Sequence, residues 1–162
     1  VYSYLPLGLK VLRNIENIVR KEMEKAGASE VLMPAMSPKS YWEKTKRWDA
    51  IDVLFKVELS GGKEIALNPT HEEIVTPLVQ KFANSPKDFP KAVFQIQNKF
   101  RNEARAKSGL LRGREFLMKD AYSFHTSSED FEKYYDVMTN AYHSIPLALR
   151  TWQEIYSKKH PF

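Results

Sequence analysis

The amino-acid sequence predicts an α+β fold, in which strands pair mostly through hairpins and helices pack on the sheet. Three observations support this fold class: an apolar helical period between residues 8 and 26, two pairs of β-prone runs joined by polar segments, and a second helical period after residue 127. With 162 residues, of which 43% are hydrophobic, the chain is long enough to bury one core. Its length alone gives no reason to divide it into two globular domains.

The composition narrows the class of protein. The sequence contains no cysteine, which excludes disulfides and fits a reducing compartment, so we expect a cytoplasmic or organelle-matrix location. No apolar run approaches the roughly 20 residues that a membrane-spanning helix needs. The net charge of +5 is compatible with an RNA partner, but it is far weaker than the basic tails that indicate nucleic acid by themselves.

The first predicted element is a helix from Gly8 to Ala26. Its apolar side chains recur at helical spacing and form one face: Leu12, Ile15, Ile18, Val19 and Met23. Gly27 is a suitable residue to stop this helix, and the run VLMP at 31–34 predicts a short strand that ends in proline. A helix followed by a strand is common, and ordinary core packing explains the pair without a function.

The middle of the chain predicts a short helix, a hairpin and a second helix. Ser37 and Pro38 open the short helix, which carries Tyr41 and Trp42. The hairpin pairs residues 53–59 with 64–67 around a turn at 60–63. A helix follows through Ile74, Leu78 and Phe82, and the proline-containing span 85–90 is predicted as a loop.

The last predicted element is a helix that starts at Ser127, with Asp130 placed for a capping interaction. One side of this helix is rich in large apolar and aromatic residues. We expect them to be buried in the core and not to bind a ligand: Phe131, Tyr134, Tyr135, Met138, Tyr142 and Ile145.

The segment 93–124 predicts a strand, a loop and a strand, and it is unusually basic. Its cations are predicted to converge on one turn: Lys99, Arg101, Arg105, Lys107, Arg112, Arg114 and Lys119. Guanidinium groups present planar forks of donors that suit phosphate oxygens, so this hairpin is interpreted as an anion cradle for a nucleotide. The alternative is a solvated outer face, because Glu103 and Glu115 alternate with the cations.

The order of residues in this hairpin favours the nucleotide site. Arg101 and Glu103 are two residues apart and share a face of an extended strand, where they suit a phosphate and an amino group. Arg112 and Phe116 are four apart on the return strand and also share a face. An aromatic ring with a nearby cation is a suitable seat for a purine and its phosphates.

The segment NPTHEE at 68–73 has a structural and a functional interpretation. Thr70 and Glu73 have the spacing of a capping box at the start of the next helix. This cap would use Glu73 and leave Glu72 free for a ligand. A zinc site at His71 is rejected, because the other histidines have no paired spacing with it and the sequence has no cysteine.

These motifs together resemble the class II aminoacyl-tRNA synthetases. The pattern Phe-Arg-x-Glu, then Arg-x-x-x-Phe-x-x-x-Asp ending at Asp120, resembles motif 2 of that family, and the run LLRGREFLMKDAYSFH looks like prolyl-tRNA synthetase of the bacterial type. The helix and strand at 8–34 resemble motif 1. Thr70 and Glu72 match the Thr-x-Glu loop that binds the amino group of the amino acid in class IIa enzymes.

The resemblance implies a class II antiparallel sheet flanked by helices and the activation of proline by ATP, with Mg²⁺, for transfer to tRNA(Pro). Arg101 would be catalytic and would bridge the proline carboxylate and the α-phosphate. Proline would contact Thr70, Glu72 and Arg101, with His125 at the border of the pocket. The residues implied for ATP are Arg101, Glu103, Arg112 and Phe116. A homodimer through the motif 1 helix and strand is also implied, and no protein-bound metal is expected.

The resemblance extends from Tyr2 to about Ile145, so we expect a partial catalytic domain at 1–145, with motifs 1 and 2 but without motif 3, and a divergent tail at 146–162. Without motif 3, we expect the chain by itself to bind ATP weakly and to charge tRNA poorly. Two alternatives stay open: a non-catalytic synthetase-like module that binds RNA or protein, and another class IIa activity specific for threonine or serine.

Overall fold

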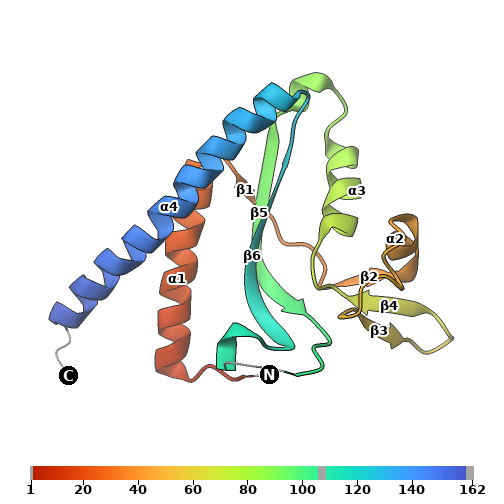
Figure 1. Ribbon diagram of the computed structural model, residues 1–162, viewed down its shortest axis with the longest axis horizontal. Helices are drawn as coiled ribbons and strands as arrows, with labels where there is room; N and C mark the ends of the chain where they lie inside the picture. Colours follow the sequence, from red (N-terminus) through yellow and green to blue (C-terminus); the bar gives the residue numbers. More distant parts are fainter. Residues whose placement is uncertain (1, 106–108, 160–162) are drawn as a thin grey trace. The chain divides into compact units, whose positions relative to one another are not determined.

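The computed structural model of the chain describes residues 2–105 and 109–159. Its fold is α+β, as the sequence predicts (Figure 1). The described part contains two three-stranded sheets. One has the order β1 (Ser29–Glu30), β5 (Lys91–Phe100), β6 (Glu115–Phe124), and the other has the order β2 (Met36–Pro38), β4 (Glu64–Leu67), β3 (Phe55–Glu58). Contacts within the chain divide it into two compact units, and strands β5 and β6 contribute residues to both.

The predicted strand, loop and strand at 93–124 are confirmed as β5 (Lys91–Phe100) and β6 (Glu115–Phe124). The two strands are neighbours in their sheet. Their connection includes the short 3₁₀ helix η2 (Gly109–Leu111), and the predicted position of Lys107 lies outside the described residues.

The first unit consists mainly of residues Val31–Ser85 and Gln95–Asp120. Its small antiparallel sheet contains β2 (Met36–Pro38), β3 (Phe55–Glu58) and β4 (Glu64–Leu67). The predicted hairpin is confirmed, with Phe55 opposite Leu67. Its turn contains Gly61 at φ +89° and Gly62 at φ +76°, which a side chain would strain.

Helices α2 (Lys39–Lys44) and α3 (Glu72–Phe82) complete the first unit, where the sequence predicts them. The hydrophobic core beside the sheet contains Trp42, Trp48, Leu54 and Ala66. The indole N–H of Trp42, which is fully buried, donates to Ser37 Oγ at 2.7 Å. This bond satisfies a polar group that would otherwise be costly to bury.

The second unit contains α1 (Pro6–Lys25), β1 (Ser29–Glu30), the 3₁₀ helix η1 (Pro86–Asp88) and α4 (Ser128–Lys159). Helix α1 confirms the predicted helix, and Gly27 adopts φ +79° immediately after it. Strand β1 runs parallel to β5, and α4 packs against α1 (Figure 1). Arg20 on α1 forms an ion pair with Glu30 on β1 at 2.7 Å.

The predicted strand at 31–34 is wrong. The strand lies two residues earlier, at Ser29–Glu30, and the chain then leaves the sheet. Two glutamine side chains from β5 take the place of a neighbouring strand: Gln95 Oε1 accepts from the Met33 N–H at 3.2 Å, and Gln97 Nε2 donates to the Met33 carbonyl at 2.5 Å. The sequence pattern predicted a strand at these residues. It could not show that glutamine side chains, instead of a neighbouring strand, would bond to the backbone of Met33.

The prediction that the aromatic face of α4 is core is wrong for several of its residues. Phe131 is 47% exposed, Tyr135 63% and Tyr142 51%. The face lines a small cavity of about 90 Å³ against residues 121–123 of β6. The described sheet next to this face has three strands, one of them two residues long, so it offers too little area to cover a whole helix face.

The start of α4 partly follows the prediction. The Asp130 N–H donates to Ser127 Oγ at 3.2 Å, as in a helix cap, but the Asp130 carboxylate contacts His125 instead of the backbone. Helix α4 continues through Pro146 to Lys159, and the boundary between a catalytic domain and a tail at 146 stays a prediction. Within the described ranges, no helix has both the length and the apolar character to cross a bilayer.

Candidate active site

The candidate site in the first unit is built on the segment 68–73, which connects β4 to α3, and on the facing ends of β5 and β6. The Phe100 N–H donates to the Asn68 carbonyl at 3.2 Å, which holds this segment beside the end of β5. Burial alternates along it: His71 and Glu73 are buried, whereas Glu72 is exposed and Thr70 half-buried. The segment therefore presents Thr70 and Glu72 outward from a buried base.

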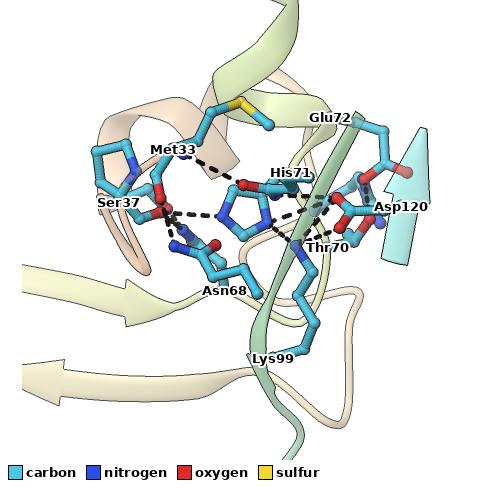
Figure 2. Close-up of polar contacts among 12 residues, drawn as sticks. Met33, Ser37, Asn68, Thr70, His71, Glu72, Lys99 and Asp120 are labelled. Atoms are coloured by element: carbon cyan, nitrogen blue, oxygen red, sulfur yellow. Dashed lines mark hydrogen bonds and ion pairs between the residues drawn. The ribbon is translucent and has the colours of Figure 1, made fainter. Parts of the chain in front are cut away.

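That base is a polar cluster around a fully buried lysine (Figure 2). Lys99 Nζ lies 2.8 Å from Asp120 Oδ1 and 2.5 Å from His71 Nδ1. Gln95 Nε2 donates to the Asp120 carboxylate at 3.0 Å. The prediction that Lys99 belongs to the anion cradle is therefore wrong, because its ammonium is already neutralised inside the protein.

These contacts determine which nitrogen of His71 carries the proton. An ammonium can only donate hydrogen bonds, so His71 Nδ1 must be the acceptor. The proton then sits on Nε2, which donates to the Pro34 carbonyl at 3.0 Å. Burial, followed by the charge of Lys99, lowers the pKa of His71, which agrees with a neutral imidazole.

The cluster extends towards the small sheet through buried side chains. The Pro34 carbonyl also accepts from Asn68 Nδ2 at 2.9 Å. Ser37 Oγ donates to Asn68 Oδ1 at 2.6 Å. In Figure 2, the imidazole of His71 lies between Asn68 and Ser37 on one side and Lys99 and Asp120 on the other. One hydrogen-bonded group thus links four segments that are distant in the sequence.

The predicted capping box at Thr70 and Glu73 does not form. His71 occupies the N-cap position of α3, and no side chain caps the helix there. The Thr70 hydroxyl instead donates to the Glu72 carboxylate. Glu72 is therefore not free of contacts, as the capping box would have left it, but is held by its neighbour and lies 3.8 Å from Arg47 Nη1.

Glu73, the other member of that predicted box, is drawn to the loop after α2. Its carboxylate accepts from Arg47 Nη1 at 2.7 Å and from the Thr45 hydroxyl at 3.1 Å. The Arg47 guanidinium also lies over the ring of Trp42, at 5.6 Å from its centroid. Arg47 lies beside the candidate site, and the sequence pattern did not predict this, because only the folded chain brings it to Glu72 and Glu73.

The predicted ATP residues form two pairs. The Arg101 guanidinium lies 5.3 Å from the ring centroid of Phe116, and Arg112 Nη2 forms an ion pair with Glu103 Oε2 at 2.7 Å. The hydrogen bond from Arg112 is the main reason that the pKa of the Glu103 carboxyl is lowered. The partners differ from the predicted ones, because the spacing of residues paired Arg101 with Glu103 and Arg112 with Phe116.

Some details of this arrangement differ from the prediction. Arg101 and Glu103 follow β5, and Arg112 precedes β6, so none of the three lies on the regular strands. Arg114 does not face a ligand, because its guanidinium donates to the carbonyls of Glu103 at 2.9 Å and Ala104 at 3.3 Å. These bonds hold the loop itself, and the Arg101 N–H donates to the Arg114 carbonyl at 2.9 Å.

His125, predicted at the border of the proline pocket, belongs to the second unit. Its Nδ1 lies 2.6 Å from Asp130 Oδ2, and its ring packs against those of Phe131 and Tyr134. These contacts explain its burial by themselves. A role for His125 towards proline stays a prediction.

The lowered pKa of His71 predicts how stability depends on pH. Below its ordinary pKa of 6.5, the unfolded chain binds a proton at this residue that the folded chain does not. The free energy of unfolding is therefore expected to fall as the pH drops from about 6.5 towards the lowered pKa of the folded chain. Above about pH 6.5, this residue should not change the free energy of unfolding. Urea unfolding across this range measures the slope. His71→Gln lacks the titrating group, so an unchanged slope in that variant would assign the effect to another residue.

Comparisons with known proteins identify the family of this chain. Residues 55–160 match the model of the tRNA synthetase class II core domain (G, H, P, S and T). The proline–tRNA ligases of Sulfurihydrogenibium sp. (strain YO3AOP1) and Persephonella marina are 55% and 54% identical to the chain over 146 residues. These alignments cover 90% of the chain but only 26% of each relative, so the chain spans about a quarter of their length.

Solved structures show the same fold. Giardia lamblia prolyl-tRNA synthetase in complex with prolyl-adenylate superposes with a TM-score of 0.80 at 26% identity, covering 87% of this chain and 30% of that one. The Cryptosporidium parvum enzyme, complexed with L-proline and AMP, has the same fold at a TM-score of 0.78 and 21% identity, covering 90% of this chain and 29% of that one. With the family model matching well over half of the sequence, the chain belongs to the class II tRNA synthetase core domain family.

Proposed function

We propose that this chain forms the proline-activating part of a proline–tRNA ligase. The observation that carries the proposal is the pairing of Arg101 with Phe116, next to the Arg112–Glu103 ion pair and directly after the strand that carries Lys99. A guanidinium against an aromatic ring suits a nucleotide, and the Thr70–Glu72 pair suits an amino group. The relatives at 55% and 54% identity are proline–tRNA ligases, which favours proline over threonine and serine.

The proposed reaction is the attack of the proline carboxylate on the α-phosphorus of ATP. The bond from this phosphorus to the bridging oxygen breaks, pyrophosphate leaves, and prolyl-adenylate remains for transfer to tRNA(Pro). The attacking carboxylate is already ionised at neutral pH, so the step needs no general base. Catalysis then rests on positioning and on stabilising the charge that develops on the phosphate.

Each residue has a proposed role in this step. Arg101 bridges the proline carboxylate and the α-phosphate, and Phe116 stacks on the adenine. Thr70 and Glu72 bind the imino group of proline. For Glu103 and Arg112, the ion pair of 2.7 Å must open when ATP binds, because the carboxylate then accepts from the adenine amino group and the guanidinium contacts the outer phosphates. Arg112 is 58% exposed, which leaves it room to move.

Magnesium would be held mainly by the phosphates of ATP. Among the side chains that the structure describes, no three of His, Cys, Asp or Glu are grouped so that they would bind a metal ion. Mg²⁺ commonly binds through substrate phosphates with few protein ligands, so the residues present are compatible with this mode. When bound, the ion would neutralise charge on the outer phosphates.

The remaining parts of the proposal concern the assembly. We propose that residues 1–145 form a partial catalytic domain, that 146–162 form a tail, and that α1 and β1 contribute to a homodimer. Leu5 and Leu7, at the start of α1, are 75% and 64% exposed, which provides apolar surface near that element. A cytoplasmic location is proposed because a sequence without cysteine fits a reducing compartment.

Calorimetric titration with non-hydrolysable aminoacyl-sulfamoyl adenosines tests this function. The prolyl compound is expected to bind saturably, and the threonyl and seryl compounds at least about ten-fold more weakly, because a pocket built for one side chain loses about 1 to 3 kcal/mol with another. Stronger binding of the threonyl or seryl compound would reassign the specificity. RNA binding without saturable binding of any of the three would favour a non-catalytic module.

A further inference from the structure

The feature behind this inference is the position of His71 between the two proposed proline ligands. Thr70 and Glu72 are at least partly exposed, whereas His71 between them is fully buried, and its ring is bonded at both nitrogens. Consecutive side chains here point in different directions. The orientation of the outer two therefore depends on where the buried one is anchored.

The anchor of His71 lies on β5 and β6, the two strands that flank the loop with most of the proposed ATP residues. Lys99, which donates to His71 Nδ1, lies on β5 two residues before Arg101, which directly follows the strand. Asp120, which holds Lys99 at 2.8 Å, follows Phe116 by four residues along β6. One buried cluster is thus joined through the chain to both halves of the proposed site, the amino-acid side and the nucleotide side. Figure 2 shows this cluster beside the amino-acid side, with Thr70 and Glu72.

The contacts of the imidazole are directional. Lys99 needs an acceptor at Nδ1, and the Pro34 carbonyl, at 3.0 Å, needs a donor at Nε2. Rotation of the ring by half a turn would exchange Nδ1 with Cδ2 and Nε2 with Cε1, and so would present a carbon atom to both partners. The two bonds therefore fix the ring in one orientation, and with it the backbone of residues 70–72.

We propose that His71 is a positioning residue, which Lys99 and the Pro34 carbonyl lock in one orientation so that Thr70 and Glu72 face the proline held by Arg101. This inference rests on the proposed function and adds to it a residue that does not touch the substrate. It predicts that loss of the ring contacts weakens recognition of the proline portion while recognition of the nucleotide portion is kept.

Two variants separate the hydrogen bonds of His71 from its volume. His71→Phe keeps a buried ring but removes both polar contacts. His71→Gln has an oxygen and an N–H on one terminal group, so it retains an acceptor for Lys99 and a donor for Pro34. Calorimetric titration of the full chain uses two ligands, prolyl-sulfamoyl adenosine and ATP, and circular dichroism verifies that each variant is folded.

The expected result is a split between the two ligands. His71→Phe should bind prolyl-sulfamoyl adenosine at least about ten-fold more weakly, as expected when hydrogen bonds to a charged partner are lost. Its affinity for ATP should stay within about two-fold of the original chain, and His71→Gln should restore most of the affinity for the prolyl compound. If His71→Phe does not fold, His71→Asn, which keeps only the acceptor near Nδ1, takes its place and should show the same split.

Three results would overturn the inference. Unchanged binding of the prolyl compound by the folded variant would show that His71 does not position its neighbours. Equal losses for ATP and the prolyl compound would show a general structural role. Failure of the unmodified chain to bind the prolyl compound would remove the proposed function and this inference with it, whereas the first two results leave the proposed function intact.

Discussion

Arg101→Ala is expected to reduce proline-dependent ATP–pyrophosphate exchange by about 10²- to 10³-fold. Removal of one donor that stabilises developing charge typically costs about 3 to 4 kcal/mol in the transition state. The fold should remain intact, because Arg101 is only half-buried and its guanidinium contacts the ring of Phe116 at 5.3 Å rather than a buried carboxylate. The exchange rate measures the effect, and circular dichroism verifies the fold.

The matched control for this variant is Arg105→Ala. Arg105 is exposed on the same loop, so the substitution removes an equal charge from the region without touching the Arg101–Phe116 pair. Exchange is expected to change little. Similar losses in the two variants would attribute the effect to the overall charge of the loop, and near-normal exchange in Arg101→Ala would refute the role assigned to Arg101.

Lys99→Met is expected to lower the free energy of unfolding by about 3 to 5 kcal/mol, because loss of one partner leaves the other buried charge uncompensated. Lys99 is fully buried and Asp120 is only 10% exposed, so water cannot replace the missing ammonium well. Burial lowers the pKa of Lys99, and the hydrogen bond to Asp120 opposes this shift. Urea unfolding at neutral pH measures the loss.

Lys39→Met provides the comparison for the buried pair. Lys39 also forms an ion pair with a carboxylate, Glu64, but this pair is partly exposed. Exposed pairs contribute little to stability because water and salt screen them, so the variant should be nearly as stable as the original chain. The double variant Lys99→Met with Asp120→Leu should lose less than Lys99→Met alone, because no unpaired carboxylate is left. A larger loss in the double variant would contradict the buried-pair account.

The two largest predicted effects are expected at residues close in sequence but different in role. Lys99 and Arg101 are two positions apart at the end of β5, and the sequence pattern predicted that both belong to the anion cradle. The structure separates them: Lys99 is enclosed with Asp120 and His71, whereas Arg101 lies beyond the strand against Phe116. Lys99→Met is thus expected to affect stability, and Arg101→Ala is expected to affect catalysis.

The sequence by itself determined the parts of this protein that depend on neighbouring residues. The helix that ends before Gly27, the hairpin turned by Gly61 and Gly62, and the strands on either side of the basic loop all follow from local periodicity and turn residues. The residue order also pointed to Arg101, Glu103, Arg112 and Phe116, but it paired Arg101 with Glu103 and Arg112 with Phe116, whereas the folded chain pairs Arg101 with Phe116 and Arg112 with Glu103.

Only the tertiary structure decided which polar residues are buried. Lys99 contacts His71, which is 28 positions away in the sequence, and Asp120, which is 21 positions away. Glu73 contacts Arg47 across 26 positions. A local pattern assigns a lysine or a glutamate to the surface, because charged residues are seldom buried without a partner. The partner is supplied by distant segments, and so the capping box, the place of Lys99 in the anion cradle and the strand at 31–34 were predicted wrongly.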